Sequence, residues 1–414
     1  AVAGCAGRLH SQAMVALAGQ AERLSASPAR LRRFEACLRL LRRLADGGGS
    51  GDLGRLCDSL LAVLRTTAAF ALHRGNPEMC VDLHWRLANS YSHTPSLRLT
   101  YLRNMAERHA EAGHLSEAAF CAFAGLSPNI EQFEQRFGDD LPQEERDGCS
   151  PEGLADLIQQ AADLLARAER YELVAPCLRP ALAFHEARRD YARQAALYEQ
   201  CAAACKAVGS TRGKRFLETF YRVGLYGDLF EEKQVFVYKE PGLTRLAELA
   251  DRLRAVYEAR FGADKVTMLT DSGEVDDTKL ESGRAYVQIT YVQAETSEAD
   301  GSSRHFVLET PFTRSGERHG SVEDQWRRRT RLTAEAAFPT VVKRLRVIRS
   351  EHEDLSPLAV AVLELRAAAA KIRSAAEAEP PDMKRLQMVL QGCLATQVRG
   401  WLWSCFGIHA RILD

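Results

Sequence analysis

The sequence predicts an α+β protein of several lobes, in which helices come first, a sheet follows and helices return. Three observations predict this order. Leucine and alanine recur at helical spacing through residues 12–208, short β-branched and aromatic runs fill residues 220–310, and helical spacing resumes after about residue 354. Because the strands follow one another with little helix between them, the sheet is expected to be antiparallel. A chain of 414 residues has room for two or three domains.

The first half is predicted to be helical throughout. Glycines at 47–51 are expected to break it early, and residues 126–150, which are acidic and punctuated by Pro and Gly, are expected to form a surface excursion. Ser150 and Pro151 form an N-cap signal before the clearest apolar stripe of the chain. Antiparallel helices of this length indicate a bundle or a short helical-repeat array. The helices are expected near residues 12–45, 52–74, 78–91, 96–112, 115–125, 151–168, 170–188 and 190–208.

Short strands are predicted next, with one helix among them. Thr244 is the expected cap of that helix, and Gly262 its stop. In residues 286–292, Val287, Ile289 and Tyr291 share one face while Gln288 and Thr290 occupy the other, which is typical of a half-buried strand. The strands are expected at residues 220–225, 235–239, 266–269, 286–292 and 304–310.

Two helices are predicted to close the chain. Ser356 and Pro357 repeat the N-cap signal, and Leu358, Ala361, Val362, Leu365 and Ile372 form the stripe after it. After Pro380 and Pro381, a last helix is expected to begin at Asp382. These residues would form a smaller helical lobe after the sheet.

Composition gives no sign of a nucleic-acid or membrane partner. The 55 basic and 55 acidic residues balance, so the chain has no overall field to attract polyanions. Eleven scattered cysteines without a C-x-x-C pair indicate reduced thiols, and we expect a cytoplasmic protein. No apolar run approaches the roughly 18 residues of a membrane span. Membrane contact is expected only through regions outside this chain.

No motif for covalent catalysis, a cofactor or a metal is found. The chain lacks a phosphate-binding loop, a dinucleotide fingerprint, a nucleophile elbow and a zinc-protease motif. Cys201 and Cys205 share a helix face, where close packing is a better interpretation than a metal site. The dispersed histidines 84, 93, 109 and 114 are interpreted as packing or surface residues. We therefore expect no cofactor, no metal and no enzyme chemistry.

An arginine cluster beside Trp326 leaves two interpretations open. Its members, Arg327, Arg328, Arg329 and Arg331, suit phosphate groups of nucleic acid or lipid. The favoured interpretation is a solvated strand or helix edge paired with Glu323 and Asp324, because the neutral chain offers no wider basic face.

Eight sequence blocks in one order carry a family resemblance over residues 80–398. The blocks lie at residues 81–124, 221–227, 236–241, 271–272 with 285–292, 309–313, 328–333, 338–339 and 386–392. They include Tyr221-Arg-Val-Gly-Leu-Tyr-Gly227, Glu309-Thr-Pro-Phe-Thr313 and Leu386-Gln-Met-Val-Leu-Gln-Gly392. Together they resemble the second homology region (DOCKER domain) of the DOCK (dedicator of cytokinesis) family, most closely the subgroup acting on Rac and its cell-division-control relative.

The resemblance implies three lobes after an upstream helical scaffold at residues 1–80. Residues 81–213 would form a helical lobe of the dimerising type, residues 214–352 the sheet lobe, and residues 353–414 part of a helical exchange lobe. The region would act as a guanine nucleotide exchange factor, gripping a Rac-like Rho-family GTPase without bound nucleotide and displacing Mg²⁺. That makes it a regulator of cytoskeletal signalling, with a homodimer expected through the helical lobe.

The resemblance also assigns residues to this site. Val398 would block the metal position, with Gly400 in the same loop, and the GTPase contact is assigned to Tyr286, Gln288, Thr290, Thr310, Phe312 and Arg328. Residues 399–414 depart from the family pattern, so the exchange lobe is expected to be incomplete or altered and the chain a fragment. The alternative hypothesis is a helical-repeat scaffold without exchange activity, which the alanine-rich helices before residue 210 would suit.

Overall fold

The computed structural model describes residues 12–25, 27–48, 51–73, 76–91, 95–135, 151–211, 218–230, 233–242, 244–296, 302–314, 324–377 and 383–393. It has helices first, then a sheet, then helices, so the predicted α+β class is confirmed. The chain divides into two compact units. The first comprises Ala1–Phe306 and Thr333–Ile348, and the second comprises Val307–Leu332 and Arg349–Asp414. The lobe boundaries taken from the resemblance stay a prediction.

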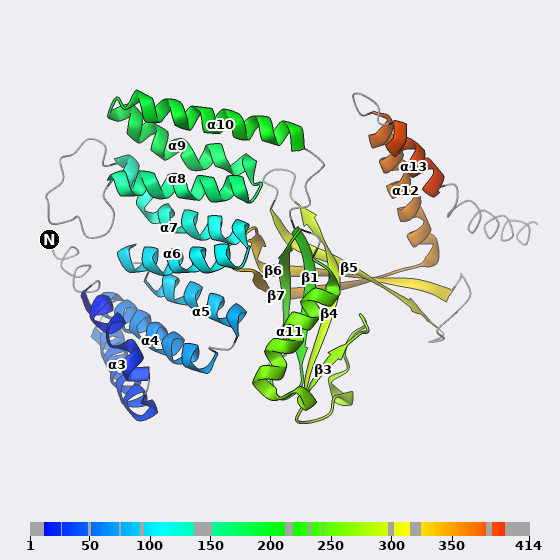
Figure 1. Ribbon diagram of the computed structural model, residues 1–414. Coiled ribbons are helices and arrows are strands. Elements are labelled where there is room, and N and C mark those ends of the chain that lie inside the picture. The colour runs from blue at the N-terminus through cyan, green and yellow to red at the C-terminus, as the bar shows by residue number, and fades with distance from the viewer. Residues whose placement is uncertain are drawn as a thin grey trace, which may run out of the picture. The chain divides into compact units, whose positions relative to one another are not determined.

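The first unit begins with a succession of helices. Each helix from α3 to α10 packs against the next one along the chain (Figure 1). None of the described helices combines the length and apolarity needed to cross a bilayer. Their bounds are α2 Ala21–Ser25, α3 Pro28–Gly48, α4 Gly51–Leu72, α5 Pro77–Ser90, α6 Pro95–Glu111, α7 Leu115–Gln135, α8 Pro151–Arg167, α9 Tyr171–Ala187 and α10 Tyr191–Thr211.

Three helix–helix turns share one backbone geometry. Gly113, Glu169 and Arg189 have φ angles of 79°, 57° and 57°, in the left-handed region that ends helices. In each turn, the N–H of the next residue donates to a carbonyl one turn back. The N···O distances are 2.8 Å from His114 to His109, 2.8 Å from Arg170 to Leu165 and 2.9 Å from Asp190 to His185. This recurrence is what the predicted repeat-like lobe requires.

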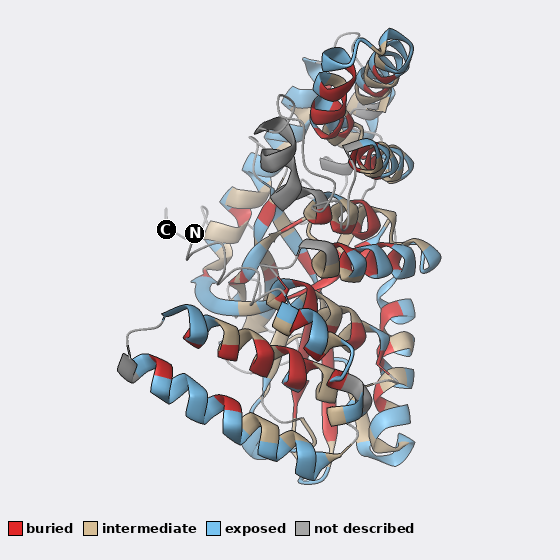
Figure 2. Cartoon of the chain, turned by 90° about the vertical axis from the view of Figure 1, so that its left-hand side faces the viewer, coloured by how far each residue is buried: buried red, intermediate tan, exposed pale blue. Residues whose placement is uncertain are grey.

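Two apolar cores hold the helices together. One joins α2, α3, α4 and α5 around Leu64 and Tyr91, and the other joins α7, α8, α9 and α10 around Ile158 and Leu178. Buried positions follow one side of each helix and exposed positions the other (Figure 2). Replacing Ile158 with Ala would leave a cavity in the closely packed interior and lower the free energy of unfolding by about 2–5 kcal/mol.

The sheet has seven strands, in the order β1-β2-β7-β6-β5-β4-β3, and β1 also pairs with β4. Strand β1 therefore has neighbours on both edges, antiparallel to each of them. Strand β3 pairs in parallel with β4. The bounds are β1 Glu218–Tyr226, β2 Gln234–Pro241, β3 Val266–Leu269, β4 Ala285–Thr296, β5 Ser303–Thr313, β6 Gln325–Phe338 and β7 Arg344–Leu355.

Helix α11, Leu246–Phe261, covers one face of the sheet (Figure 1). Its Leu249, Leu253 and Tyr257 pack on residues of β1, β2 and β4 such as Val223 and Val287. The predicted cap was wrong by one residue. Arg245 precedes the helix, and its N–H donates to the Glu248 carboxylate at 3.3 Å, whereas the Thr244 hydroxyl donates to the carbonyl of Pro241.

The second unit comprises the outer parts of β5, β6 and β7 with helices α12, Pro357–Ala376, and α13, Met383–Cys393. The predicted cap at Ser356 is confirmed, because its hydroxyl oxygen accepts from the N–H of Ala359 at 3.3 Å. Leu358, Val362 and Leu365 are exposed on α12.

Several sequence-based predictions are corrected. Helix α7 continues to Gln135, so the first part of the expected excursion is helical, and residues 136–150 lie outside the described part. Helices α3 and α4 reach Gly48 and Gly51, which leaves only residues 49–50 of the predicted glycine break undescribed. The long strand β7 was not predicted, and the arginine segment of β6 was left open as a strand or helix edge.

Candidate functional site

Three residues assigned to the partner contact lie near one another in the second unit. Thr310 and Phe312 are on β5, Arg328 is on β6, and all three are half-buried. The Arg328 guanidinium carbon lies 5.2 Å from the centre of the Phe312 ring, within the range of a cation–π contact. Arg328 also donates to Asp354 of β7 through two nitrogens, at 2.7 and 3.1 Å. The planar pairing fixes the arginine on a surface that a partner can reach.

The arginines on either side of Arg328 point to the opposite face of β6, since side chains alternate along a strand. Both bind Glu309 of β5: Arg327 at 2.9 Å and Arg329 at 2.8 Å. Arg327 also donates to Glu364 at 2.7 Å and so links β6 to α12. Partial burial of Glu309 opposes ionisation, but the hydrogen bonds from Arg329 and Arg327 hold its pKa below the ordinary value.

For three members of the arginine cluster, these pairings favour the interpretation of a paired strand edge. Arg327, Arg328 and Arg329 are neutralised by Glu309, Asp354 and Glu364, so they do not form an open phosphate-binding patch. The expected pairing with Glu323 and Asp324 stays a prediction. Glu323 lies outside the described residues, and Asp324 accepts from the backbone N–H of Arg314, whose guanidinium stacks 3.5 Å from the centre of the Trp326 ring system.

Two other assigned residues, Tyr286 and Gln288, are buried in the first unit. Gln288 is only 1% exposed, and its amide nitrogen donates to the carbonyls of Asp271 and Gly273 at 2.6 and 2.8 Å. Its oxygen accepts from Arg222 at 2.6 Å. The Tyr286 hydroxyl accepts from the N–H of Glu281 at 3.1 Å. Their part in a partner contact stays a prediction.

The register of β1 and β4 explains this burial. Tyr286, Gln288 and Thr290 lie opposite Tyr226, Gly224 and Arg222. A Cβ at Gly224 would come within 2.5 Å of the Tyr226 ring, so only glycine fits there. The predicted two faces of β4 are correct, but both are covered over residues 285–288, because Val287 packs under α11. Thr290 is half-buried, and its hydroxyl has no hydrogen-bond partner among the described residues.

The residues expected to act on the nucleotide and its metal, Val398 and Gly400, lie outside the described residues. So does the departing segment 399–414. Their roles stay predictions.

A network of buried charges in the first unit was not predicted. Arg344, at the start of β7, donates to Asp82 of α5 at 2.7 Å and to the hydroxyl of Tyr238 at 2.9 Å. Lys343 binds Glu240 at 2.8 Å, and Arg252 of α11 binds the same carboxylate at 2.6 Å. Charges this deeply buried require partners, so the network specifies how the helices meet the sheet.

Two buried histidines lie beside this network. His114 and His109 have ring centres 6.0 Å apart, and His114 Nε2 is 3.2 Å from the Lys343 ammonium. Burial, followed by the charge of Lys343, lowers the pKa of His114 to about 4. Burial likewise lowers the pKa of His109, whose Nε2 is 3.1 Å from the carbonyl of Val341. Both rings are therefore neutral near pH 7, which agrees with a packing role.

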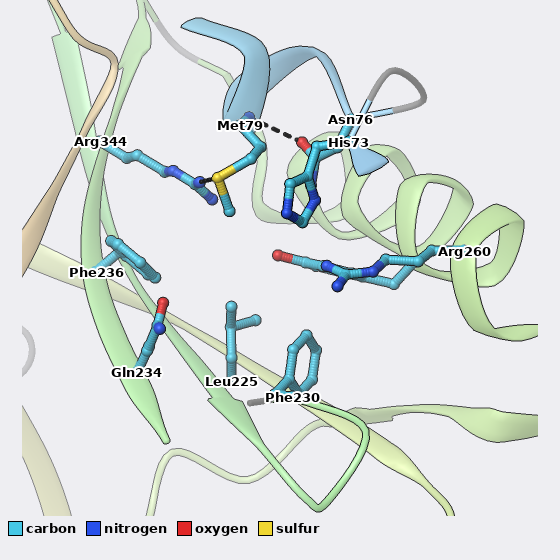
Figure 3. A pocket seen from close by; sticks show the side chains of 10 residues that line it. His73, Asn76, Met79, Leu225, Phe230, Gln234, Phe236, Arg260 and Arg344 are labelled. Carbon is cyan, nitrogen blue, oxygen red and sulfur yellow. Dashed lines mark hydrogen bonds between the residues drawn. The ribbon is translucent and has the colours of Figure 1, made fainter. Parts of the chain in front are cut away.

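A cavity of about 80 Å³ beside Arg344 is lined from α5, α11 and the strands β1 and β2 (Figure 3). The close-up shows Arg344 reaching the sulfur of Met79, and Asn76 accepting from the N–H of Met79. The Arg344 guanidinium carbon also lies 4.7 Å from the centre of the Phe236 ring. This space accommodates a few waters and is too small for a nucleotide or peptide.

Two family models match segments of this sequence, in the same order as the helices and the sheet. Residues 82–126 and 122–210, which include α6 to α9, match the model "DHR-2, Lobe A". Residues 272–337, which include β4, β5 and most of β6, match "DHR-2, Lobe B". The class of region that the fold and sequence define is therefore DHR-2.

Similarity to curated proteins gives the family. The chain is 35% identical to mouse dedicator of cytokinesis protein 9 over 402 residues, which cover 84% of this chain and 20% of the relative. It is 35% identical to mouse dedicator of cytokinesis protein 6, with 86% and 19% covered, and 34% identical to human dedicator of cytokinesis protein 7, with 82% and 18% covered. The chain belongs to the dedicator of cytokinesis family, and the predicted resemblance is confirmed. It spans about a fifth of the length of these relatives.

Proposed function

We propose that this chain provides a guanine nucleotide exchange region for a Rho-family small GTPase, with a Rac-like protein as the preferred partner. The observation that carries the proposal is the succession of DHR-2 lobe A and lobe B sequences on a helical array followed by a sheet. The chain would act as a regulator, binding another protein without covalent chemistry. It would need no cofactor, since GDP, GTP and Mg²⁺ belong to the GTPase.

The proposed mechanism is differential binding. A protein that binds the nucleotide-free GTPase more tightly than the loaded form lowers the barrier to nucleotide release. Val398 would occupy the Mg²⁺ position with an apolar side chain, which offers no lone pair to a cation. Gly400 would belong to the same loop.

The exposed contact would include Thr310, Phe312 and Arg328. An arginine held by a carboxylate and stacked on an aromatic ring is already ordered, so little side-chain entropy is lost when a partner binds. Tyr286 and Gln288 would support the sheet from inside. Thr290 lies between these two groups, because it is half-buried and its hydroxyl lacks a hydrogen-bond partner among the described residues.

The proposal is tested by release of fluorescent GDP from Rac. The purified chain should accelerate release over the spontaneous rate, and Val398→Ala should bind nucleotide-free Rac while releasing GDP more slowly. Binding without acceleration would retain the partner and refute exchange by this chain. Unchanged release from the Val398→Ala variant would remove that residue from the mechanism.

The alternative is a scaffold that uses the helices alone, and the shared geometry of the helix–helix turns favours it. Failure to bind any nucleotide-free Rho-family GTPase would support the scaffold over the exchange factor.

A homodimer through the helical lobe is part of the proposal. On α10, Tyr191 and Tyr198 are 68% and 55% exposed, seven residues apart, and Cys205 continues the same stripe. Exposed aromatic and small residues in line suit helix–helix packing. Light scattering of wild type and Tyr198→Glu would test this: a dimer that becomes a monomer only in the variant supports it, and a monomeric wild type contradicts it.

We also propose a cytoplasmic location. Seven of the described cysteines are free thiols, and free thiols suit a reducing compartment. Four of them are buried: Cys57, Cys80, Cys121 and Cys177. Fractionation of cells expressing the chain would test this.

A further inference from the structure

A second, larger cavity lies in the first unit where the start of α7, the α8–α9 turn and β2 meet. Its volume is about 230 Å³, which leaves room for several waters or a small polyatomic ion. Residues 113–117, residues 167–170, Lys239 and Pro241 line it. The lobe matches and the proposed exchange mechanism give this space no role.

Hydrogen-bond donors without acceptors border the cavity. The Oγ of Ser116 and the Nε of Arg170 are buried and have no partner among the described residues. Arg170 is only 9% exposed, so its Nε has no direct access to bulk water. The first N–H groups of α7, a helix of 21 residues, have no acceptor within the helix and lie at its positive end. These donors call for an acceptor that the described residues do not provide.

The buried charges on the cavity wall are paired, and Arg167 stands apart from them at the rim. Lys239 has a side chain only 4% exposed and binds Glu117 at 2.8 Å, with Glu218 at 3.5 Å. Another nitrogen of Arg170 binds Glu218. Arg167 is exposed at the rim and forms no ion pair with the described residues. Counting Glu218 with the lining residues, the cations Arg167, Arg170 and Lys239 are matched by the carboxylates Glu117, Glu169 and Glu218.

We propose that this cavity is a binding site for a small oxyanion, a carboxylate or phosphate group held by the start of α7, Ser116 and Arg170. The oxygens would accept from the helix N–H groups, the Ser116 hydroxyl and the free Nε of Arg170. Arg167 at the rim would supply positive charge to balance that of the bound group. Lys239 and Glu117 keep their own pairing and form the polar wall of the site.

The test compares inorganic phosphate, sulfate and acetate with chloride at equal ionic strength, using the whole chain. Isothermal titration and the melting temperature are measured for wild type, Ser116→Ala, Arg167→Gln and the control Arg188→Gln. Arg188 is an exposed arginine just after α9, and its side chain binds Glu152 and lies over the Phe184 ring, away from the residues that line the cavity. Circular dichroism verifies that each variant is folded.

We expect saturable binding of an oxyanion to wild type and to the control. Loss of the Ser116 hydroxyl should weaken this binding about fivefold, and so should loss of Arg167. Stronger binding of phosphate than acetate would indicate a phosphate group as the natural ligand, and the reverse order a carboxylate. A response that does not saturate, or that is equal in all four proteins, would overturn the proposal and leave the cavity to water.

Discussion

Arg344 and Asp82 are 262 residues apart in the sequence, yet their side chains meet at 2.7 Å. The arginine side chain is 3% exposed and the aspartate side chain 20%. This pair fastens the start of β7 to α5, and Tyr238 and Phe236 surround the same guanidinium. The contact between the helices and the sheet therefore depends on the buried Arg344, whose charge is paired with Asp82 only when the chain is folded.

Replacing Asp82 with Ala should destabilise the protein by about 3 kcal/mol, because it leaves Arg344 buried with its main partner removed. Urea unfolding followed by circular dichroism would measure the loss. As a control, Arg349→Ala removes an exposed pair with Glu351 and should cost less than about 1 kcal/mol. Equal effects of the two changes would contradict the importance given to the buried pair.

The left-handed turn residues predict opposite effects for two substitutions. Arg189→Gly should raise the free energy of unfolding by about 1 kcal/mol, since glycine adopts φ of 57° without the strain of a side chain. Gly113→Ala should lower it by a similar amount, although a Cβ would meet no atom within 4 Å. Thermal unfolding of both variants measures the two shifts. A Gly113→Ala variant as stable as wild type would show that this turn tolerates the strain.

His114 predicts a loss of stability in acid. Its folded pKa of about 4 lies below an unfolded value near 6.5. The unfolded chain therefore binds the proton first, and the stability from a neutral His114, full above about pH 6.5, is lost as the pH falls toward 4. The total is about 3 kcal/mol. Unfolding free energies at pH 7 and 5 should differ less in His114→Gln than in wild type. Equal differences in wild type and His114→Gln would contradict this assignment.

Phe312→Ala should weaken binding of nucleotide-free Rac about tenfold, because aromatic residues at the centre of interfaces commonly contribute more than 1 kcal/mol. Surface plasmon resonance would measure the affinity. Arg254→Ala, an exposed change on α11, is the matched control and should leave the affinity unaltered. Equal affinity of wild type and Phe312→Ala would place the interface elsewhere.

The helices and the early strands could be predicted because their signals are local. The stripe after Pro151 and the cap at Ser356 each depend on neighbours a few residues away. Strand β7 gave no such signal, since most of its residues from 346 to 354 are exposed and its pairing with β6 and β2 holds it in place. The partners of the β6 arginines could not be predicted either, because these carboxylates come from β5, β7 and α12.

The candidate site was predictable only in part. Alternation correctly separated the two faces of β4, but it could not reveal that the face with Gln288 is closed by β1, because that pairing joins residues more than 60 positions apart. The sequence offered one signal for the buried network around Arg344 and Lys343. Charged residues interrupt the apolar strand that contains Tyr238, and others follow the Phe-Pro pair. Their partners depend on tertiary contacts that no spacing in the sequence specifies.

The recurring turn after α6, α8 and α9 has an evolutionary consequence. A unit that begins and ends with the same backbone geometry can be duplicated or deleted without disturbing the orientation of the helices on either side.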